Sequence, residues 1–191
     1  IDIRGSYSSC FGGVTDNQTI INAGNAGPGL NIYGGSDPVN LRLENLSFIN
    51  GLNDISEQAG GLNLTRNNMN LYLTNVSVSN NQGISGGGLY VSSDNTTLYF
   101  KETRIFNNIA SDGGGLYCDQ PSYIYIRNQS AVSFNQATSG LSDHGNGGGI
   151  YLKGNCGVSL VSGDDSISGI YGVVGNSANK SGGGVFLSNG R

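Results

Sequence analysis

Apolar and polar residues alternate in short segments along the chain, and no segment shows a helical period of useful length. In the unit that begins at Leu89, the alternating segments are residues 89–91, residues 98–100 and the stretch that ends at residues 104–106. A period of two predicts half-buried strands, each too short to fold alone. Clusters of Asn, Gly, Ser and Asp separate these segments and predict turns. The pattern therefore predicts an all-β fold with three short strands in each unit.

A glycine triplet followed by an apolar-aromatic-apolar step marks the start of each unit. The full triplets begin at Gly86, Gly113, Gly147 and Gly182, and a degenerate copy begins at Gly60. Because Leu62, Leu89 and Leu116 recur at one constant interval, the pattern is that of a solenoid. In a solenoid each strand pairs in parallel with its equivalent one rung away, at about 4.8 Å, and equivalent side chains stack on one another.

The first and third positions of each short strand are predicted to face the interior of the coil. Asn63 replaces the aromatic residue at the middle position, which indicates that the middle position faces outward. The predicted core positions are Leu62, Leu64, Leu71, Leu73, Leu89, Val91, Leu98, Phe100, Leu116, Cys118, Ile124 and Ile126.

Asparagines form a second repeated series, in the turns. Asn81, Asn108 and Asn135 recur at the same interval as the leucines, and Asn176 occupies the corresponding place further on. Stacked asparagine amides can hydrogen-bond along the coil axis, and asparagine tolerates the left-handed backbone that a sharp corner needs. The glycine triplets suit a positive φ or a close approach of neighbouring turns. These structural uses need no ligand.

Two insertions interrupt the regular spacing. The steps from Leu116 to Ile150 and from Ile150 to Val185 are both longer than the step from Leu89 to Leu116, which places the extra residues near 139–146 and 163–169. Insertions of this kind become loops that protrude from one side of a solenoid. These two loops are therefore the first places in which to look for function.

The chain is expected to form one domain, residues 1–191. Residues 60–191 carry the regular repeats, whereas residues 1–59 follow the pattern more loosely and are predicted to form irregular lower rungs, giving about six rungs in all. The sequence starts without methionine and stops soon after a repeat begins, so we expect it to be a fragment of a longer chain.

The repeat resembles those of known surface proteins. An asparagine after a hydrophobic strand, followed by Gly-Gly-Gly and an aliphatic residue, is similar to the repeat of polymorphic outer-membrane protein and autotransporter passengers. Residues 48–51 and 133–135 are similar to the related Phe-x-x-Asn element, and residues 3–10 resemble the opening of large bacterial right-handed β-helix repeat proteins. The resemblance covers nearly the whole chain and implies a pectate-lyase-like (pectin-lyase-like), right-handed parallel β-helix. It also implies a secreted or surface-displayed protein, often an adhesive passenger.

Composition narrows the classes of partner and cofactor. A net charge of −4, a pI near 4.7 and the absence of a basic cluster argue against nucleic acid and anionic membrane. No run of about 20 apolar residues predicts a membrane span. Cys10, Cys118 and Cys156 match no metal-ligand spacing, so no metal and no cofactor is expected. Cys118 is predicted to be a small buried hydrophobe, and a disulfide to Cys156 is the alternative.

The candidate catalytic residues are Asp164, Asp165 and His144, in the two insertions. Paired aspartates and a histidine-glycine step are similar to elements of β-helical polygalacturonases, and glycoside hydrolysis uses two carboxyl groups. Here the histidine precedes the aspartates and the Arg-x-Lys substrate clamp is absent. A solvated acidic turn and an ordinary loop histidine are the simpler interpretation, so we expect a chain without catalytic activity.

Two aromatic series occupy outward positions and are the predicted binding residues. Exposed rings can stack on sugars or anchor a partner protein, whereas ladders of rings can also stabilise a parallel sheet by stacking on their own equivalents. One series is Tyr90, Tyr117, Tyr151 and Phe186, and the other is Tyr72, Tyr99 and Tyr125.

These observations favour a non-enzymatic, extracellular or cell-surface β-solenoid. Such a scaffold would act as an adhesin-like passenger that binds a surface glycan or a host protein. One alternative is a carbohydrate-active β-helix that binds or cleaves an acidic polysaccharide. Another is a fibre subunit that forms homo-oligomers by end-to-end stacking of unpaired strand edges.

Overall fold

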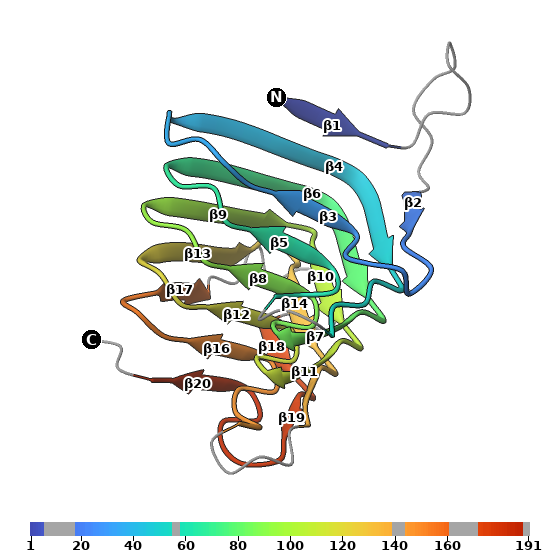
Figure 1. Cartoon of the computed structure of the whole chain (residues 1–191), viewed down its shortest axis with the longest axis vertical. Coiled ribbons are helices and arrows are strands. Elements are labelled where there is room, and N and C mark those ends of the chain that lie inside the picture. Colours follow the sequence, from blue (N-terminus) through green and yellow to red (C-terminus); the bar gives the residue numbers. More distant parts are fainter. Residues whose placement is uncertain (6–17, 55–57, 139–143, 161–171, 189–191) are drawn as a thin grey trace.

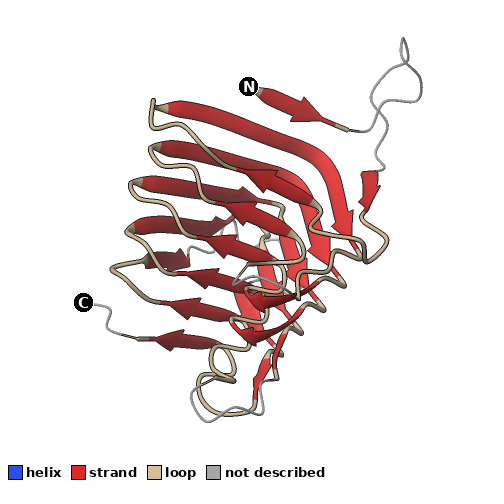
Figure 2. Ribbon diagram, in the orientation of Figure 1, coloured by secondary structure: helices blue, strands red, loops and turns tan. Residues whose placement is uncertain are grey.

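The structure, a computed structural model, describes residues 1–5, 18–54, 58–138, 144–160 and 172–188, and this part is all-β. Figure 2 shows strands joined by turns and loops. Within the described residues, no helix is present that could cross a bilayer. Every pairing between the described strands is parallel. The predicted all-β, parallel class is therefore confirmed.

The strands lie in three sheets, which we call the long, the short and the six-stranded sheet. The long sheet contains β1 (Asp2–Arg4), β2 (Thr19–Asn22), β4 (Val39–Ile49), β6 (Met69–Ser79), β9 (Thr96–Lys101), β10 (Arg104–Phe106), β13 (Ser122–Arg127), β14 (Ala131–Ser133), β17 (Gly157–Leu160) and β18 (Gly172–Val174). The short sheet contains β7 (Gln82–Ser85), β11 (Ile109–Asp112), β15 (Gln136–Ala137) and β19 (Ser177–Ala178). The six-stranded sheet contains β3 (Leu30–Ile32), β5 (Leu62–Leu64), β8 (Leu89–Val91), β12 (Leu116–Cys118), β16 (Ile150–Leu152) and β20 (Val185–Leu187).

The strand register follows the repeat that the sequence predicts. Leu89 pairs with Leu62 on one side and with Leu116 on the other, so neighbours in the sheet are separated by one period of the sequence. The register continues across both insertions, because Leu116 pairs with Ile150 and Ile150 with Val185. Most of the inserted residues, 139–143 and 161–171, lie outside the described part.

The looser N-terminal segments join the same sheets. Strand β3 pairs with β5, and β4 pairs along its length with β6. Strands β1 and β2 both pair with β4, at its beginning and its end. Figure 1 shows these strands stacked in the order of the chain, with a solenoid-like curvature.

A sharp bend divides the long sheet into two faces. Strands β4 and β6 run through this bend without a break, and Asn45 and Asn75 adopt left-handed backbone there, with φ of 56° and 49°. One repeat further on, Glu102 has a φ of 52° and separates β9 from β10, which both pair with β6. Asparagine tolerates this conformation better than most residues, so a glutamate at the bend is unusual.

The core confirms the predicted interior. All twelve predicted core positions are buried, and they belong to one continuous cluster that also includes Phe48, Met69, Ile105 and Val132. Full burial of one such aliphatic side chain contributes about 2 kcal/mol. Because equivalent residues stack on one another, the buried residues of successive repeats join in this one cluster.

The short sheet is the element that sequence reasoning missed. Its strands of two to four residues lie after the third predicted strand of one repeat and before the first strand of the next. They carry no readable alternation, since the residues of β7 are Gln, Gly, Ile and Ser. A complete repeat, such as the one from β9 to β12, therefore has four strand segments rather than the predicted three.

The predicted asparagine ladder is present and buried. The side-chain amide of Asn81 donates to Oδ1 of Asn108 at 3.0 Å, and Asn108 donates in the same way to Asn135 at 3.0 Å. Asn135 continues the ladder to Asn176 at 3.0 Å. Each of these amides also donates to a strand carbonyl of the preceding repeat; that of Asn108 reaches Val78 at 2.9 Å.

The left-handed corner does not fall on the ladder residues, which corrects the sequence expectation. Positive φ occurs one residue earlier, at Asn80, Asn107 and Phe134, with values of 54° to 56°. The ladder residue itself turns its amide inward, where it satisfies buried backbone groups that would otherwise be costly. The glycine triplets serve both predicted roles: Gly86 has a φ of 67°, and a Cβ added to Gly115 would lie 2.6 Å from the carbonyl oxygen of Gly149.

We predict that Asn108→Ala lowers the free energy of unfolding by about 3 kcal/mol, because the buried backbone N–H and side-chain amide of Asn81 lose their acceptor and the carbonyl of Val78 loses a donor. In thermal unfolding followed by circular dichroism, this corresponds to a fall in Tm of about 6–12 °C. The matched control is Asn107→Gly, at an exposed position with a φ of 54°. Equal Tm values for the two variants would contradict the ladder's role.

Candidate functional site

The outer tyrosine row, Tyr72, Tyr99 and Tyr125, lies half-buried on the long sheet. Its rings stack face to face, with centroids 4.9 and 5.2 Å apart and planes within 9°. The guanidinium of Arg42 lies 5.3 Å from the ring centroid of Tyr72, and that of Arg127 lies 4.3 Å from the ring of Tyr125. The predicted self-stacking is therefore confirmed.

Because of this stacking, only the edges and hydroxyls of the outer tyrosine row are accessible to a ligand. The ring faces lie against one another, and an arginine lies over Tyr72 and over Tyr125. A sugar ring that needs an open aromatic face has no such face along this row. The row presents ring edges and phenol hydroxyls, one in each repeat, so any binding by these residues would use hydrogen bonds.

The second series, Tyr90, Tyr117, Tyr151 and Phe186, is also stacked, with centroids 5.8, 4.8 and 5.1 Å apart. We call it the covered aromatic row. The expectation that it is exposed is wrong for its first two members, because Tyr90 is 7% exposed and Tyr117 is 9% exposed. They pack with Ala59 in a small apolar cluster separate from the main core, which the sequence did not predict.

Acidic groups accompany the covered aromatic row. Burial raises the pKa of Tyr117, and the neighbouring Tyr151, Asp119, Asp112 and Tyr90 raise it further. The hydroxyl of Tyr90 donates to Oδ2 of Asp119 at 3.3 Å. Tyr117 therefore stays a neutral phenol over the whole range in which exposed tyrosines begin to ionise.

His144 contacts an aspartate that sequence reasoning did not connect with it. Its Nδ1 lies 2.6 Å from Oδ2 of Asp112, which is buried at the end of β11. The other oxygen of Asp112 accepts the backbone N–H of Asn146 at 2.9 Å. Asp112 thus holds the returning end of the first insertion against the short sheet. Asp164 and Asp165 lie outside the described residues.

The described residues contain no group of three or more histidine, cysteine, aspartate or glutamate side chains that could hold a metal ion. His144 and the backbone N–H of Asn146 each contact one oxygen of Asp112. This geometry matches a structural anchor for a loop.

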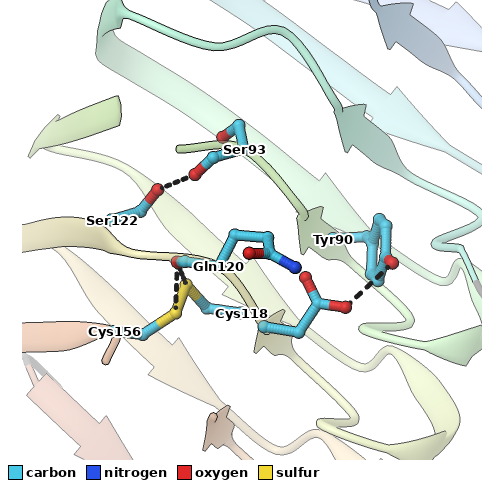
Figure 3. Close-up of a disulfide and its surroundings, with 7 residues drawn as sticks. Tyr90, Ser93, Cys118, Gln120, Ser122 and Cys156 are labelled. Carbon is cyan, nitrogen blue, oxygen red and sulfur yellow. Dashed lines mark hydrogen bonds between the residues drawn. A yellow bond between two sulfur atoms is a disulfide. The ribbon is translucent and has the colours of Figure 1, made fainter. Parts of the chain in front are cut away.

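Cys118 and Cys156 form a disulfide, with a Cα–Cα distance of 6.2 Å (Figure 3). Cys118 is on β12, and Cys156 lies in the turn that follows β16, the next strand of the same sheet. Cys118 is also fully buried in the core. The structure thus selects the alternative that the sequence left open, and the bridge links consecutive repeats.

A hollow of about 580 Å³ lies at the bend in the long sheet. Its lining residues come mainly from strand β6 and from the junction between β9 and β10. Its lining includes Gln18, Ser77, Glu102, Arg104, Phe106 and Gln129. Sequence reasoning missed this site because its residues come from four repeats and share no motif.

Comparison with protein-family models, curated proteins and solved structures finds no match to this chain.

We predict that reduction of the disulfide destabilises the protein by about 4 kcal/mol, the loop-closure estimate for cysteines that are 38 residues apart. Urea unfolding with and without dithiothreitol measures this difference. The control is Cys118→Val with Cys156→Ser, which keeps an aliphatic residue at a position equivalent to Val91. The double variant should have the same free energy of unfolding as the reduced wild type, and dithiothreitol should not change it. If dithiothreitol lowered the stability of the double variant as much as that of wild type, the disulfide would not be the cause.

Proposed function

We propose that the chain is a non-enzymatic, extracellular or cell-surface β-solenoid, a scaffold that binds or displays ligands on its outer surface. The proposal includes a specific fold, a right-handed parallel β-helix of the pectate-lyase-like type, similar to that of adhesive passengers. The described parallel sheets and their solenoid-like curvature support this.

One observation carries the scaffold role: the most regular polar and aromatic side chains are used within the structure. The asparagine ladder satisfies backbone groups, and the tyrosine rings of both rows stack on their own equivalents. Catalysis needs groups directed at a substrate, with geometry that only a few positions can supply. Here the repeated chemistry builds length and rigidity, which are the properties of a display scaffold.

The extracellular location is supported by covalent chemistry. A disulfide that links two repeats forms and persists in oxidising compartments, and it is rare in the cytosol. Low charge and abundant asparagine, glycine and serine suit a surface that is exposed to solvent rather than one that binds nucleic acid.

We predict that the purified chain binds extracellular glycans or matrix proteins on an array through the phenol hydroxyls of the outer tyrosine row. The test variant carries Tyr72→Phe, Tyr99→Phe and Tyr125→Phe, which keeps the ring stack and removes the hydroxyls. We expect binding to weaken about tenfold, the effect of losing one or two net hydrogen bonds. The matched control is Tyr117→Phe in the covered aromatic row, which is 9% exposed and should bind like wild type. No binding by wild type, or equal binding by the triple variant, would count against this proposal.

A further inference from the structure

The hollow at the bend of the long sheet combines an aromatic ring, a guanidinium and a carboxylate. It lies apart from both aromatic rows, and its volume of about 580 Å³ is in the range of small-molecule sites. We propose that this hollow binds a pyranose sugar that carries a carboxylate. This proposal rests on the proposed function in one respect, because it takes the ligand to be part of an extracellular glycan.

Phe106 supplies what the tyrosine rows lack, an aromatic ring without a stacked neighbour. Its partners in the adjacent strands are Ser79 and Ser133, so no aromatic ring covers it within the part of the chain described. The ring is half-buried and lines the hollow. An open aromatic face binds the apolar C–H face of a sugar, and this contact does not depend on ligand charge.

Arg104 supplies the preference for an anion. It is exposed at the start of β10, next to Ser77 and Ala131 in the adjacent strands. Among the described residues, no carboxylate lies within 4.0 Å of its guanidinium nitrogens. A guanidinium binds a carboxylate through two parallel charge-assisted hydrogen bonds, which a neutral sugar cannot match.

Glu102 supplies acceptors for sugar hydroxyls. It stands at the left-handed bend, where Asn75 occupies the equivalent position one repeat earlier. The next repeat carries Gln129 at the same position, with a φ of 63°, so two successive repeats place a long polar side chain in the lining of the hollow. The Nζ of Lys101 lies 3.8 Å from Oε1 of Glu102, which offsets the negative charge that would repel an anionic ligand.

Gln18 forms part of the wall of the hollow and is held in place by hydrogen bonds. Its amide donates to the backbone carbonyl of Asn75 at 2.8 Å, and its oxygen accepts the hydroxyl of Ser77 at 2.7 Å. The wall is therefore set before a ligand arrives, which lowers the entropy cost of binding. The arrangement places the ring of the sugar on Phe106, its hydroxyls at Glu102 and its carboxylate at Arg104.

The test is saturation-transfer NMR on the whole chain with two probes, methyl β-glucuronide and methyl β-glucoside. Phe106→Ser introduces the residue that both adjacent repeats already carry at this position, so its fold is expected to survive, as circular dichroism will check. Arg104→Gln keeps length and polarity and removes the charge. The control is Tyr33→Phe, at an exposed tyrosine that does not line the hollow and belongs to neither aromatic row.

We expect wild type and the control to bind glucuronide at least about tenfold better than glucoside, the difference made by a charge-assisted hydrogen bond. Phe106→Ser should abolish transfer to both probes, and Arg104→Gln should remove the difference between them. No transfer from wild type, equal binding of the two probes, or unchanged transfer in folded Phe106→Ser would overturn the proposal. Because these readouts do not involve the tyrosine hydroxyls, the array experiment can fail while this one succeeds, and the reverse.

Discussion

Each repeat of this protein depends on contact with its own equivalent in the next repeat. Backbone hydrogen bonds, the buried asparagine amides and the stacked rings all join residues that are one period apart wherever the spacing is regular. An isolated repeat would leave a buried amide and the edge of each strand without partners. The fixed register is therefore the constraint on which the core, the ladders and the outer surface depend.

The sequence predicted well what the repeat itself encodes. Core positions such as Leu89 and Leu116, the ladder asparagines and the ring stacks follow from spacing, because equivalent residues must meet. It could not predict the short sheet, whose two to four residues show no alternation. It also could not predict that Tyr90 and Tyr117 are covered, because an outward direction on a strand does not reveal what packs over it.

The candidate site lies where the pattern is broken. Phe106 stands between serines, and Glu102 stands where the previous repeat has an asparagine, so neither serves a ladder. The sequence pattern pointed to the two insertions as functional loops. In the described part of the first insertion, however, His144 and Asn146 are held by Asp112. Regular positions stabilise the scaffold, and the residues that we propose to bind a ligand are departures from that regularity.

The most direct measurement of the register constraint is the removal of one whole repeat. Excision of residues 89–115 joins Gly88 to Leu116 and brings β12 beside β5 with the repeat period intact. Excision of residues 90–115 leaves one extra residue in the strand and shifts the side chains toward the opposite face. Thermal unfolding should show a single cooperative transition for the first variant and a clearly lower Tm for the second. Equal stability of the two variants, or an unfolded first variant, would contradict the account.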